Sequence, residues 1–347
     1  MNKIKLFLGG HINKQNAQNL NCNALSRYLN KDKYDIYTMS RTDGNIDIVE
    51  IENFATIFKY NHKLKFLKSW NYIKALYFCD ILYLPRRDGL SLVLFFNKFF
   101  KKKIFLTIEA LFDQQTIKGR SVDKVVNTIN NVQYVYSITR YMKDINKNSV
   151  NLNSLDSILY LGVDLSTITV KKEISKVLKN IIFIGNDMQR KRVDEYLKLS
   201  KLYPNLIFHI VGTPNSLDIN QINKEYKNVT VHGSKTPIEL NKILQIMDLH
   251  ILTSKSEGCP KVVFETAAVG IPSIVYGSYG AKEWIDNDEN GFIINNFDEL
   301  VNKINILNTD SSLLYNSSKN AIKLSEKFSW SNMIKSWEYE IDRIASD

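Results

Sequence analysis

Apolar runs of strand length alternate with longer amphipathic segments along most of the chain. Short apolar runs bounded by polar residues or glycine predict buried strands, and they occur at residues 3–8, 35–39, 80–85, 104–108, 134–137, 180–185, 207–211, 229–232, 249–253, 273–276 and 292–294. Apolar residues that recur about every 3.6 positions predict helices, at residues 16–29, 64–78, 90–100, 123–130, 140–145, 193–202, 239–247, 261–269, 300–307, 312–328 and 330–344. Residues 48–57 fit neither pattern.

The alternation of strands and helices starts twice, first at Lys3 and again at Asn180. Each series has glycine or polar residues after its strands, which is typical of a doubly wound parallel sheet. We therefore predict an α/β protein of two doubly wound, Rossmann-like domains that face a central cleft. The 347 residues and the 44% hydrophobic content suffice for two cores. The expected parts are a domain at 1–165, a polar and basic linker at 166–179, a domain at 180–329 and a last helix at 330–347.

The stretch 249–294 is the most informative part of the sequence. Its first strand, 249–253, leads into a loop that contains one glycine. Pro260 then stands where a helix starts, because its missing N–H group costs nothing at the first helical position. The helix 261–269 ends at Gly270, a residue typical of helix ends. The pattern predicts a strand, a loop and a helix whose start is well defined.

Two glutamates stand eight residues apart around this helix start. Glu265 lies in a helix that is apolar on almost every side, so we expect it to be buried and to need hydrogen-bond donors. A ribose diol would supply them, and so would a partner inside the core. Glu257 lies on the loop, where it either helps to hold a ligand or only balances the helix dipole. N–H groups at a helix start attract anions and sugar oxygens, and the candidate residues here are Gly258, Cys259, Pro260, Lys261 and Val262.

The motif Glu257-Gly-Cys-Pro…Glu265, followed by Gly270-Ile-Pro, resembles the E-x7-E signature of retaining GT-B glycosyltransferases, the GT4-like group. The resemblance implies a GT-B fold. It also implies that Glu265 binds the ribose of a nucleotide-sugar and that Glu257 and the loop amides bind the donor hexose. In that family the last helix, here 330–347, crosses back onto the N-terminal domain. The resemblance is strong over residues 180–297 and weak over the first 160 residues.

Three adjacent cations, Arg190, Lys191 and Arg192, follow the first strand of the second domain and precede a helix. A cationic cluster in that place suits a diphosphate, although three such charges are usually only solvated. The related family carries Arg after the strand's glycine and Lys before a second glycine. Here Asn186 replaces that Arg and Lys191 matches the Lys. We expect Arg190 to supply the lost charge.

Other strand ends supply further candidates. Gly9 and Gly10 end the first strand, where they either bind substrate or form an ordinary tight turn. Glu109 also ends a strand, in a region where many family members carry a His near the reacting sugar. It either orients or deprotonates an acceptor hydroxyl, or it is a structural carboxylate. Ser234 and Lys235 follow a strand of the second domain, and the resemblance implies that their backbone meets the nucleobase.

The net positive charge of the chain lies in its first half. Residues 1–165 carry 24 Lys+Arg and 14 Asp+Glu, whereas residues 166–347 carry 22 of each, so the net charge of +10 lies in the first half. Lysines and aromatic residues interleave within 58–78 and 90–103. Lysines attract anionic headgroups, each by about 1 kcal/mol, while aromatic rings lie in the interface. We predict an anionic membrane surface as a partner; the alternative is a pair of core helices with solvated lysines.

Several classes of protein are disfavoured by what the sequence lacks. The cysteines Cys22, Cys79 and Cys259 form no disulfide or metal pattern, which favours a reducing cytoplasm. No ligand cluster or Walker loop is present, so neither a metal nor a cofactor is expected. No apolar run approaches the roughly 20 residues that cross a bilayer, and residues 1–10 read as a strand rather than a signal peptide. No nucleic-acid recognition motif explains the charge.

The main hypothesis is a retaining, metal-independent glycosyltransferase. It would move a hexose from a nucleotide-sugar, expected to be UDP-linked, to a glycan or lipid-linked acceptor in cell-surface polysaccharide synthesis. Arg190 and Lys191 would stabilise the leaving diphosphate. The protein would be cytoplasmic and peripheral at the inner face of the cell membrane. The alternatives are a non-catalytic partner subunit of the same fold and a sugar-nucleotide epimerase.

Overall fold

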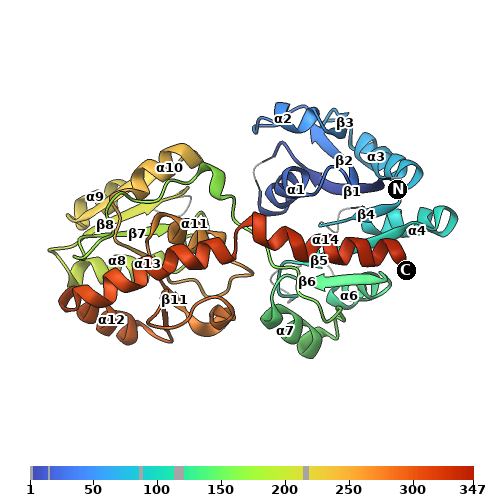
Figure 1. Cartoon of the computed structure of the whole chain (residues 1–347). Helices are drawn as coiled ribbons and strands as arrows, with labels where there is room; N and C mark the ends of the chain where they lie inside the picture. Colours follow the sequence, from blue (N-terminus) through green and yellow to red (C-terminus); the bar gives the residue numbers. More distant parts are fainter. Residues whose placement is uncertain (1–2, 15, 86–88, 113–120, 214–218) are drawn as a thin grey trace. The chain divides into compact units, whose positions relative to one another are not determined.

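The structure, a computed structural model, describes residues 3–14, 16–85, 89–112, 121–213 and 219–347. The chain divides into two compact units: unit 1 comprises Met1–Gly162 with Trp330–Asp347, and unit 2 comprises Val163–Ser329. Each unit contains one six-stranded sheet whose strands are parallel, with helices between successive strands (Figure 1). The prediction of two doubly wound α/β domains is therefore confirmed.

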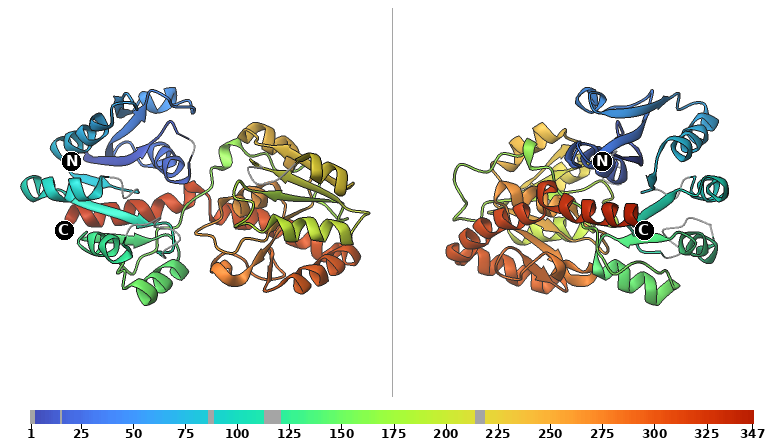
Figure 2. Two further views of the ribbon diagram at one scale, coloured as in Figure 1. Left: turned by 180° about the vertical axis from the view of Figure 1, so that it is seen from behind. Right: turned by 45° about the vertical axis from the view of Figure 1, so that its right-hand side comes forward.

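The unit 1 sheet has the strand order β3-β2-β1-β4-β5-β6. Its strands are β1 (Ile4–His11), β2 (Tyr34–Arg41), β3 (Ala55–Tyr60), β4 (Ile81–Tyr83), β5 (Lys103–Ile108) and β6 (Tyr134–Ser137). Its helices are α1 (Ala17–Tyr28), α2 (Val49–Glu52), α3 (Lys65–Phe78), α4 (Leu90–Phe100), α6 (Val122–Asn130), α7 (Arg140–Val150) and α14 (Trp330–Ser346). The inward sides of α3, α4 and α6 share one apolar core with the sheet, and α14 lies beside α1 (Figures 1 and 2).

The last helix belongs to unit 1, although unit 2 separates it from the rest of that unit in sequence. Trp337 packs edge-on against Tyr83 of β4, with ring centroids 5.4 Å apart. Its indole N–H donates to the carbonyl of Tyr160 at 3.0 Å. Tyr136 of β6 donates its hydroxyl to Glu340 of α14 at 2.8 Å. Apolar packing and buried polar pairs together hold α14 on this unit.

The unit 2 sheet has the order β12-β11-β10-β7-β8-β9. Its strands are β7 (Asn180–Ile184), β8 (Ile207–Val211), β9 (Val229–Gly233), β10 (Leu249–Leu252), β11 (Ser273–Tyr276) and β12 (Phe292–Ile294). Its helices are α8 (Val193–Leu202), α9 (Ile219–Glu225), α10 (Pro237–Leu244), α11 (Lys261–Val269), α12 (Phe297–Thr309) and α13 (Ser311–Lys327), with short 3-10 turns η1 (Leu165–Thr167), η2 (Gly277–Tyr279) and η3 (Ala281–Glu283). Because β7 and β10 are paired neighbours, the loops that follow them meet at one edge.

Local signals explain where several helices begin and end. Thr236 and Glu239 form a reciprocal capping box at the start of α10. Gly270 ends α11 at φ 90°, a left-handed conformation that glycine adopts without strain. The bounds of α11 match the predicted helix 261–269, whereas α10 begins two residues before the predicted start at 239.

The structure differs from the sequence predictions in several places, and α9, for example, was not predicted. β1 continues to His11, so Gly9 and Gly10 lie inside the strand and not in a loop after it. β3 occupies part of the segment 48–57 that fitted no pattern, because it is an edge strand with few buried positions. The expected linker, 166–179, is counted with unit 2, and the backbone N–H of Lys171 donates to Val269 of α11 at 3.1 Å. No helix among the described residues is long and apolar enough to cross a membrane.

Candidate functional site

Lys191 lies buried across the carboxyl end of β7. Lys191 is only 8% exposed. The residue that follows β7 is Gly185, and a Cβ atom there would lie 2.2 Å from Cδ of Lys191. A side chain at this position would push the lysine away from the strand end, so the glycine leaves room for Lys191. Arg192 caps α8 at φ 47°, so the chain turns sharply just after Lys191.

Lys191 points to Glu257, which comes from the loop after β10. Nζ of Lys191 lies 2.9 Å from Oε1 of Glu257, and Nη1 of Arg190 lies 3.1 Å from the same oxygen. Ser254 donates its hydroxyl to this oxygen at 2.6 Å. We call these four residues, Arg190, Lys191, Ser254 and Glu257, the donor cluster. Within the described parts of the chain, no hydrogen bond reaches the second oxygen, Oε2.

The charges of the donor cluster change the pKa of the Glu257 carboxyl. Burial raises the pKa of the Glu257 carboxyl, but the charges of Lys191 and Arg190, with the hydrogen bonds from Ser254 and Lys191, outweigh burial and hold the pKa below its ordinary value. Glu257 is therefore ionised at neutral pH. An ionised carboxylate can only accept hydrogen bonds, so Oε2 is suited to a hydroxyl donor.

Backbone contacts hold the two loops of the donor cluster together. Thr253 donates its hydroxyl to the carbonyl of Lys191 at 2.7 Å. The backbone N–H of Lys255 donates to the carbonyl of Arg190 at 3.1 Å. The Arg190 guanidinium donates to the carbonyl of Ser256 and contacts Asp187 at 3.2 Å. The side chains are thus positioned before any ligand binds, which lowers the entropy lost on binding.

Glu265 extends from α11 without a partner. Across the residues that the structure describes, no hydrogen bond or ion pair engages its carboxylate. The sequence predicted a fully buried glutamate, and this is wrong: Glu265 is partly exposed, whereas its neighbours Phe264 and Thr266 are buried. Burial of its surroundings still raises the pKa of the Glu265 carboxyl, and the charge of Lys261 offsets only part of this effect. A partly sheltered carboxylate with no protein donor is suited to a ligand that donates hydrogen bonds.

The start of α11 presents backbone N–H groups beside these glutamates. Pro260 is the residue before the helix, and its carbonyl accepts from Val263 at 2.9 Å. In the described residues, no hydrogen bond uses the N–H groups of Gly258 and Val262. Together with Cys259 and Lys261, they make a short loop at the positive end of the helix dipole. Such N–H groups can bind an anion or a sugar oxygen.

Ser234 and Lys235 lie at the carboxyl end of β9. The hydroxyl of Ser234 bonds to that of Thr213 at 2.7 Å, and the N–H of Thr213 donates to Asn186 at 2.9 Å. Asn186 therefore joins the ends of neighbouring strands where the resembled family carries an arginine. The ring of His232 hydrogen-bonds to the ring of His209 at 3.0 Å.

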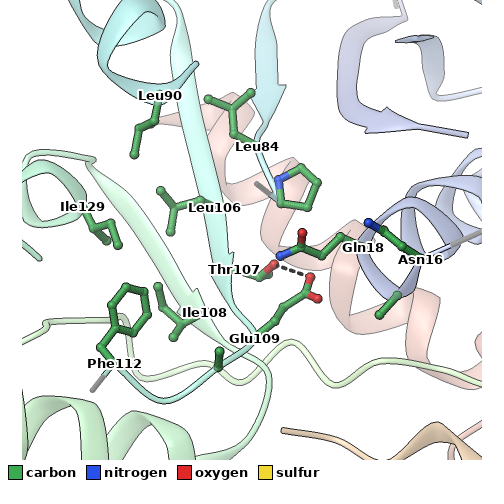
Figure 3. A pocket seen from close by; sticks show the side chains of 13 residues that line it. Asn16, Gln18, Leu84, Leu90, Leu106, Thr107, Ile108, Glu109, Phe112 and Ile129 are labelled. Carbon is green, nitrogen blue, oxygen red and sulfur yellow. Dashed lines mark hydrogen bonds between the residues drawn. The ribbon is translucent and has the colours of Figure 1, made fainter. Parts of the chain in front are cut away.

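In unit 1, Glu109 lies beside a cavity of about 280 Å³ (Figure 3). Thr107 donates its hydroxyl to Glu109 at 3.2 Å, and the Asn21 amide lies 3.4 Å from both carboxylate oxygens. Gln18 of α1 reaches the same end of the cavity (Figure 3). The other walls are apolar, formed by Leu84, Leu90, Leu106, Ile108, Phe112 and Ile129. The cavity therefore combines one charged polar end with apolar sides.

Gly9 and Gly10 serve close packing in β1. A Cβ on Gly10 would lie 2.7 Å from Sγ of Cys22 on α1, and a Cβ on Gly9 would lie 2.9 Å from the carbonyl oxygen of Tyr83 on β4. Both distances are too short for a side chain, so these glycines let α1 and β4 approach β1. Their position in the strand explains the Gly-Gly pair without a ligand.

Sequence reasoning missed two residues, Ser254 of the donor cluster and Tyr279. Ser254 directly precedes the loop of Glu257, and its hydroxyl in a short polar loop was a usable signal. The hydroxyl of Tyr279 is buried and has no hydrogen-bond partner among the described residues. Burial, together with the charge of Glu257, raises the pKa of Tyr279 well above its ordinary value. A buried tyrosine inside a glycine-rich turn gave no sign of this in the sequence. No group of three His, Cys, Asp or Glu side chains that could hold a metal occurs in the described residues.

Comparison with known proteins gives matches at the level of sequence and of structure. Residues 166–324 match the family described as Glycosyl transferases group 1. An uncharacterized glycosyltransferase of Haemophilus influenzae is 26% identical over 185 residues, which is 50% of this chain and 52% of that protein. The UDP-Gal:alpha-D-GlcNAc-diphosphoundecaprenol alpha-1,3-galactosyltransferase of Escherichia coli is 29% identical over 133 residues, 36% of this chain and 34% of that protein. The chain thus spans about half the length of the first relative and a third of the second.

Similar solved structures cover nearly the whole chain. Sucrose-phosphate synthase from Thermosynechococcus elongatus has a TM-score of 0.82 at 14% identity, over 99% of this chain and 100% of that one. Anabaena Alr3699/HepE in complex with UDP-glucose has a TM-score of 0.76 at 14% identity, over 98% of this chain and 100% of that one. At such low identity these likenesses establish the fold.

Proposed function

We propose that this chain, which is a GT-B protein of the glycosyl transferases group 1 family over residues 166–324, is a retaining, metal-independent glycosyltransferase that uses a nucleotide-sugar donor. The observation that carries the proposal is the pairing of two different carboxylates at one helix start. Glu257 is held by two cations and a hydroxyl, while Glu265 has no partner in the described residues. A structural role would leave both glutamates satisfied, whereas a sugar nucleotide needs acceptors for its hydroxyls.

Each group of the donor site has a role in the proposed reaction. The Glu265 carboxylate accepts hydrogen bonds from the ribose diol. Oε2 of Glu257 and the N–H groups at the start of α11 hold the hexose. Lys191 and Arg190 stabilise the negative charge that grows on the diphosphate as the glycosidic bond breaks. Because the buried ammonium of Lys191 lies in a poorly solvated place, its interaction with that charge is stronger than in water. The two cations supply the positive charge, and for this reason we propose that no metal is needed.

The donor and acceptor follow from the relatives and from unit 1. The Escherichia coli relative is named for a UDP-galactose donor and a diphosphoundecaprenol-linked acceptor, and one similar structure holds UDP-glucose. We therefore propose a UDP-hexose and a glycan or lipid-linked acceptor in cell-surface polysaccharide synthesis. Glu109, at the polar end of its cavity, would orient or deprotonate the acceptor hydroxyl. A lipid-linked acceptor would bring unit 1 to an anionic membrane surface at the inner face of the cell membrane.

Thermal unfolding with a panel of nucleotide-sugars tests the donor. A ligand that binds only the folded chain stabilises it by about 2.7 kcal/mol at 100 times its dissociation constant. We expect UDP-sugars to raise Tm and ADP- or GDP-sugars to leave it unchanged, with a smaller rise for Glu265→Gln. The bound donor is then incubated with lipid-linked oligosaccharides, and NMR of the product reports its anomeric configuration. A panel without any shift, or a product of inverted configuration, would contradict the proposal. Transfer by the isolated chain would also exclude a non-catalytic partner, and epimerised donor in its place would favour an epimerase.

A further inference from the structure

Exposed aromatic side chains are concentrated on two neighbouring helices of unit 1. Seven aromatic side chains are exposed among the residues described, and six belong to α3 and α4. These six, here called the aromatic face, are Phe66, Trp70, Tyr77, Phe78, Phe95 and Phe99. The seventh, Tyr339, lies on α14. The helices α3 and α4 pack against each other (Figures 1 and 2), so the aromatic face occupies one region of the unit.

The fold does not need these rings. The inward sides of α3 and α4 already supply the core, with Tyr72 and Leu76 on α3 and Val93 on α4 all nearly inaccessible. Phe66 and Phe99 are 66% and 77% exposed, so they bury little apolar area in the monomer. Tyr77 of α3 is likewise 68% exposed. Clustered exposed apolar groups of this kind mark interaction surfaces.

The same segment carries most of the net positive charge of the chain. Residues 53–108 contain nine lysines and two arginines against two aspartates. Lys63, Lys98 and Lys101 are exposed at the ends of the two helices. A second copy of the chain is a poor occupant for this surface, because two such segments would repel each other. The charge is instead complementary to a dense anionic surface.

We propose that the aromatic face docks unit 1 onto an anionic phospholipid bilayer. The rings enter the interface between headgroups and acyl chains, where aromatic side chains are favoured, and the lysines contact the phosphates. Docking would present unit 1 to a lipid-linked acceptor, so the purpose of docking rests on the proposed function. Binding to the bilayer itself requires no catalysis and is measured separately.

Trp70 provides an intrinsic probe of the contact. The chain has four tryptophans, and Trp284, Trp330 and Trp337 are at most 2% exposed, whereas Trp70 is 53% exposed. Vesicles of phosphatidylcholine, with or without phosphatidylglycerol, are titrated into the full chain. We expect a blue shift of the emission with phosphatidylglycerol, no shift without it, and a loss of the shift in Trp70→Phe. High salt should weaken binding, because it screens the lysines.

Two sets of variants test the two halves of the surface. Phe95→Ser/Phe99→Ser should weaken vesicle binding by at least about tenfold, since it removes two rings that would be buried in the interface. Lys63→Gln/Lys98→Gln should weaken it by about fivefold for each charge removed. Tyr339→Ser is the matched control, an equally exposed aromatic residue on α14, and should bind as the unmodified chain does. Sedimentation with the vesicles measures all four proteins, and Tm confirms that each is folded.

The outcomes separate this inference from the proposed function. If the unmodified chain binds UDP-sugars but no anionic vesicles, the docking surface is wrong and the glycosyltransferase proposal stands. If the chain binds anionic vesicles but no nucleotide-sugar, the docking surface stands and the glycosyltransferase proposal is wrong. Equal binding by Phe95→Ser/Phe99→Ser and Tyr339→Ser would overturn the role of the aromatic face. Tight binding of duplex DNA that competes with vesicles and depends on the same lysines would assign the surface to nucleic acid.

Discussion

Nζ of Lys191 lies 2.9 Å from Oε1 of Glu257, a residue 66 positions further along the chain. The contact exists because β7 and β10 are paired in the sheet, so that the loops after the two strands share one edge. It joins a cation suited to a diphosphate with a carboxylate suited to a sugar. Three predictions test this contact and the residues around it, and two more concern Glu109 of unit 1 and the buried histidines of unit 2.

Replacing Lys191 with Ala should reduce turnover far more than folding. Loss of a group that stabilises transition-state charge lowers kcat by about 10²- to 10³-fold. Glu257 keeps its contacts with Arg190 and Ser254, so we expect unfolding to become easier by only about 1–3 kcal/mol. Steady-state kinetics and urea unfolding measure the two effects. Lys255→Ala, an exposed lysine of the neighbouring loop, is the control, and an unchanged kcat in Lys191→Ala would refute the assignment.

Glu265→Gln should separate ligand binding from stability. In the described structure the carboxylate has no partner to lose, and burial raises its pKa. An ionised group whose pKa is raised lowers stability at neutral pH, so the amide should leave the stability equal or higher. Affinity for UDP should fall about tenfold or more, because charged hydrogen bonds contribute about 1.5–3 kcal/mol. Calorimetric titration with UDP checks this, and a destabilised variant with normal affinity would favour a purely structural glutamate.

Gly185→Ala should act through Lys191. The new Cβ would lie 2.2 Å from Cδ and 2.6 Å from Cε of that lysine, so the side chain must leave its place over the strand end. We expect a loss of kcat close to that of Lys191→Ala. In the Lys191→Ala background the same substitution should have little further effect, because nothing remains to clash. Additive losses in this double-mutant cycle would show that Gly185 acts elsewhere.

Glu109→Gln should distinguish catalysis from structure in unit 1. The amide keeps the shape of the side chain and its contacts with Thr107 and Asn21 can be remade. If Glu109 takes the acceptor proton, the rate of transfer should fall about 10²- to 10⁴-fold, while the UDP-induced rise in Tm stays the same. The two assays are run on one preparation. Normal transfer combined with a lower Tm would identify Glu109 as a structural carboxylate.

Two buried histidines of unit 2 should make the chain unstable in mild acid. Burial and the charge of Lys191 lower the pKa of His250 to about 3, and burial and His232 lower that of His209 to about 4. The unfolded chain binds these protons at the ordinary pKa of 6.5, so stability is full above that pH and falls as pH decreases towards 4. At pH 5, the protonation of each histidine in the unfolded chain lowers the free energy of unfolding by about 2 kcal/mol.

Urea unfolding at several pH values measures this loss. The variant His209→Gln/His250→Gln should show a flatter dependence on pH, whatever its stability at pH 7. A slope equal to that of the unmodified chain would mean that other groups cause the acid sensitivity. His62→Gln, a substitution of a partly exposed histidine in unit 1, is the control variant.

Most of the predicted helices and strands of the second half agree with the structure, although α9 was not predicted. The strand of residues 249–253, the start at Pro260 and the end at Gly270 were all predictable, because each depends on neighbours within a few residues. The helices and strands of the first half were harder to predict from the sequence. The edge strand β3 has an irregular pattern of burial, and Gly9 and Gly10 looked like a loop because the partners that crowd them, Cys22 and Tyr83, are distant in sequence.

The sequence by itself determined the α/β alternation, the two starts of a sheet, the two glutamates around Pro260 and the segment where lysines and aromatic residues gather. Only the tertiary structure decided which strands are neighbours, that one glutamate is paired with Lys191 while the other has no partner in the described residues, and that Trp70 faces outward while Tyr72 is buried. The physical reason is the distance along the chain over which each interaction acts. Propensity and periodicity act over a few residues, whereas an ion pair across 66 positions depends on the order of strands, to which no local interaction contributes.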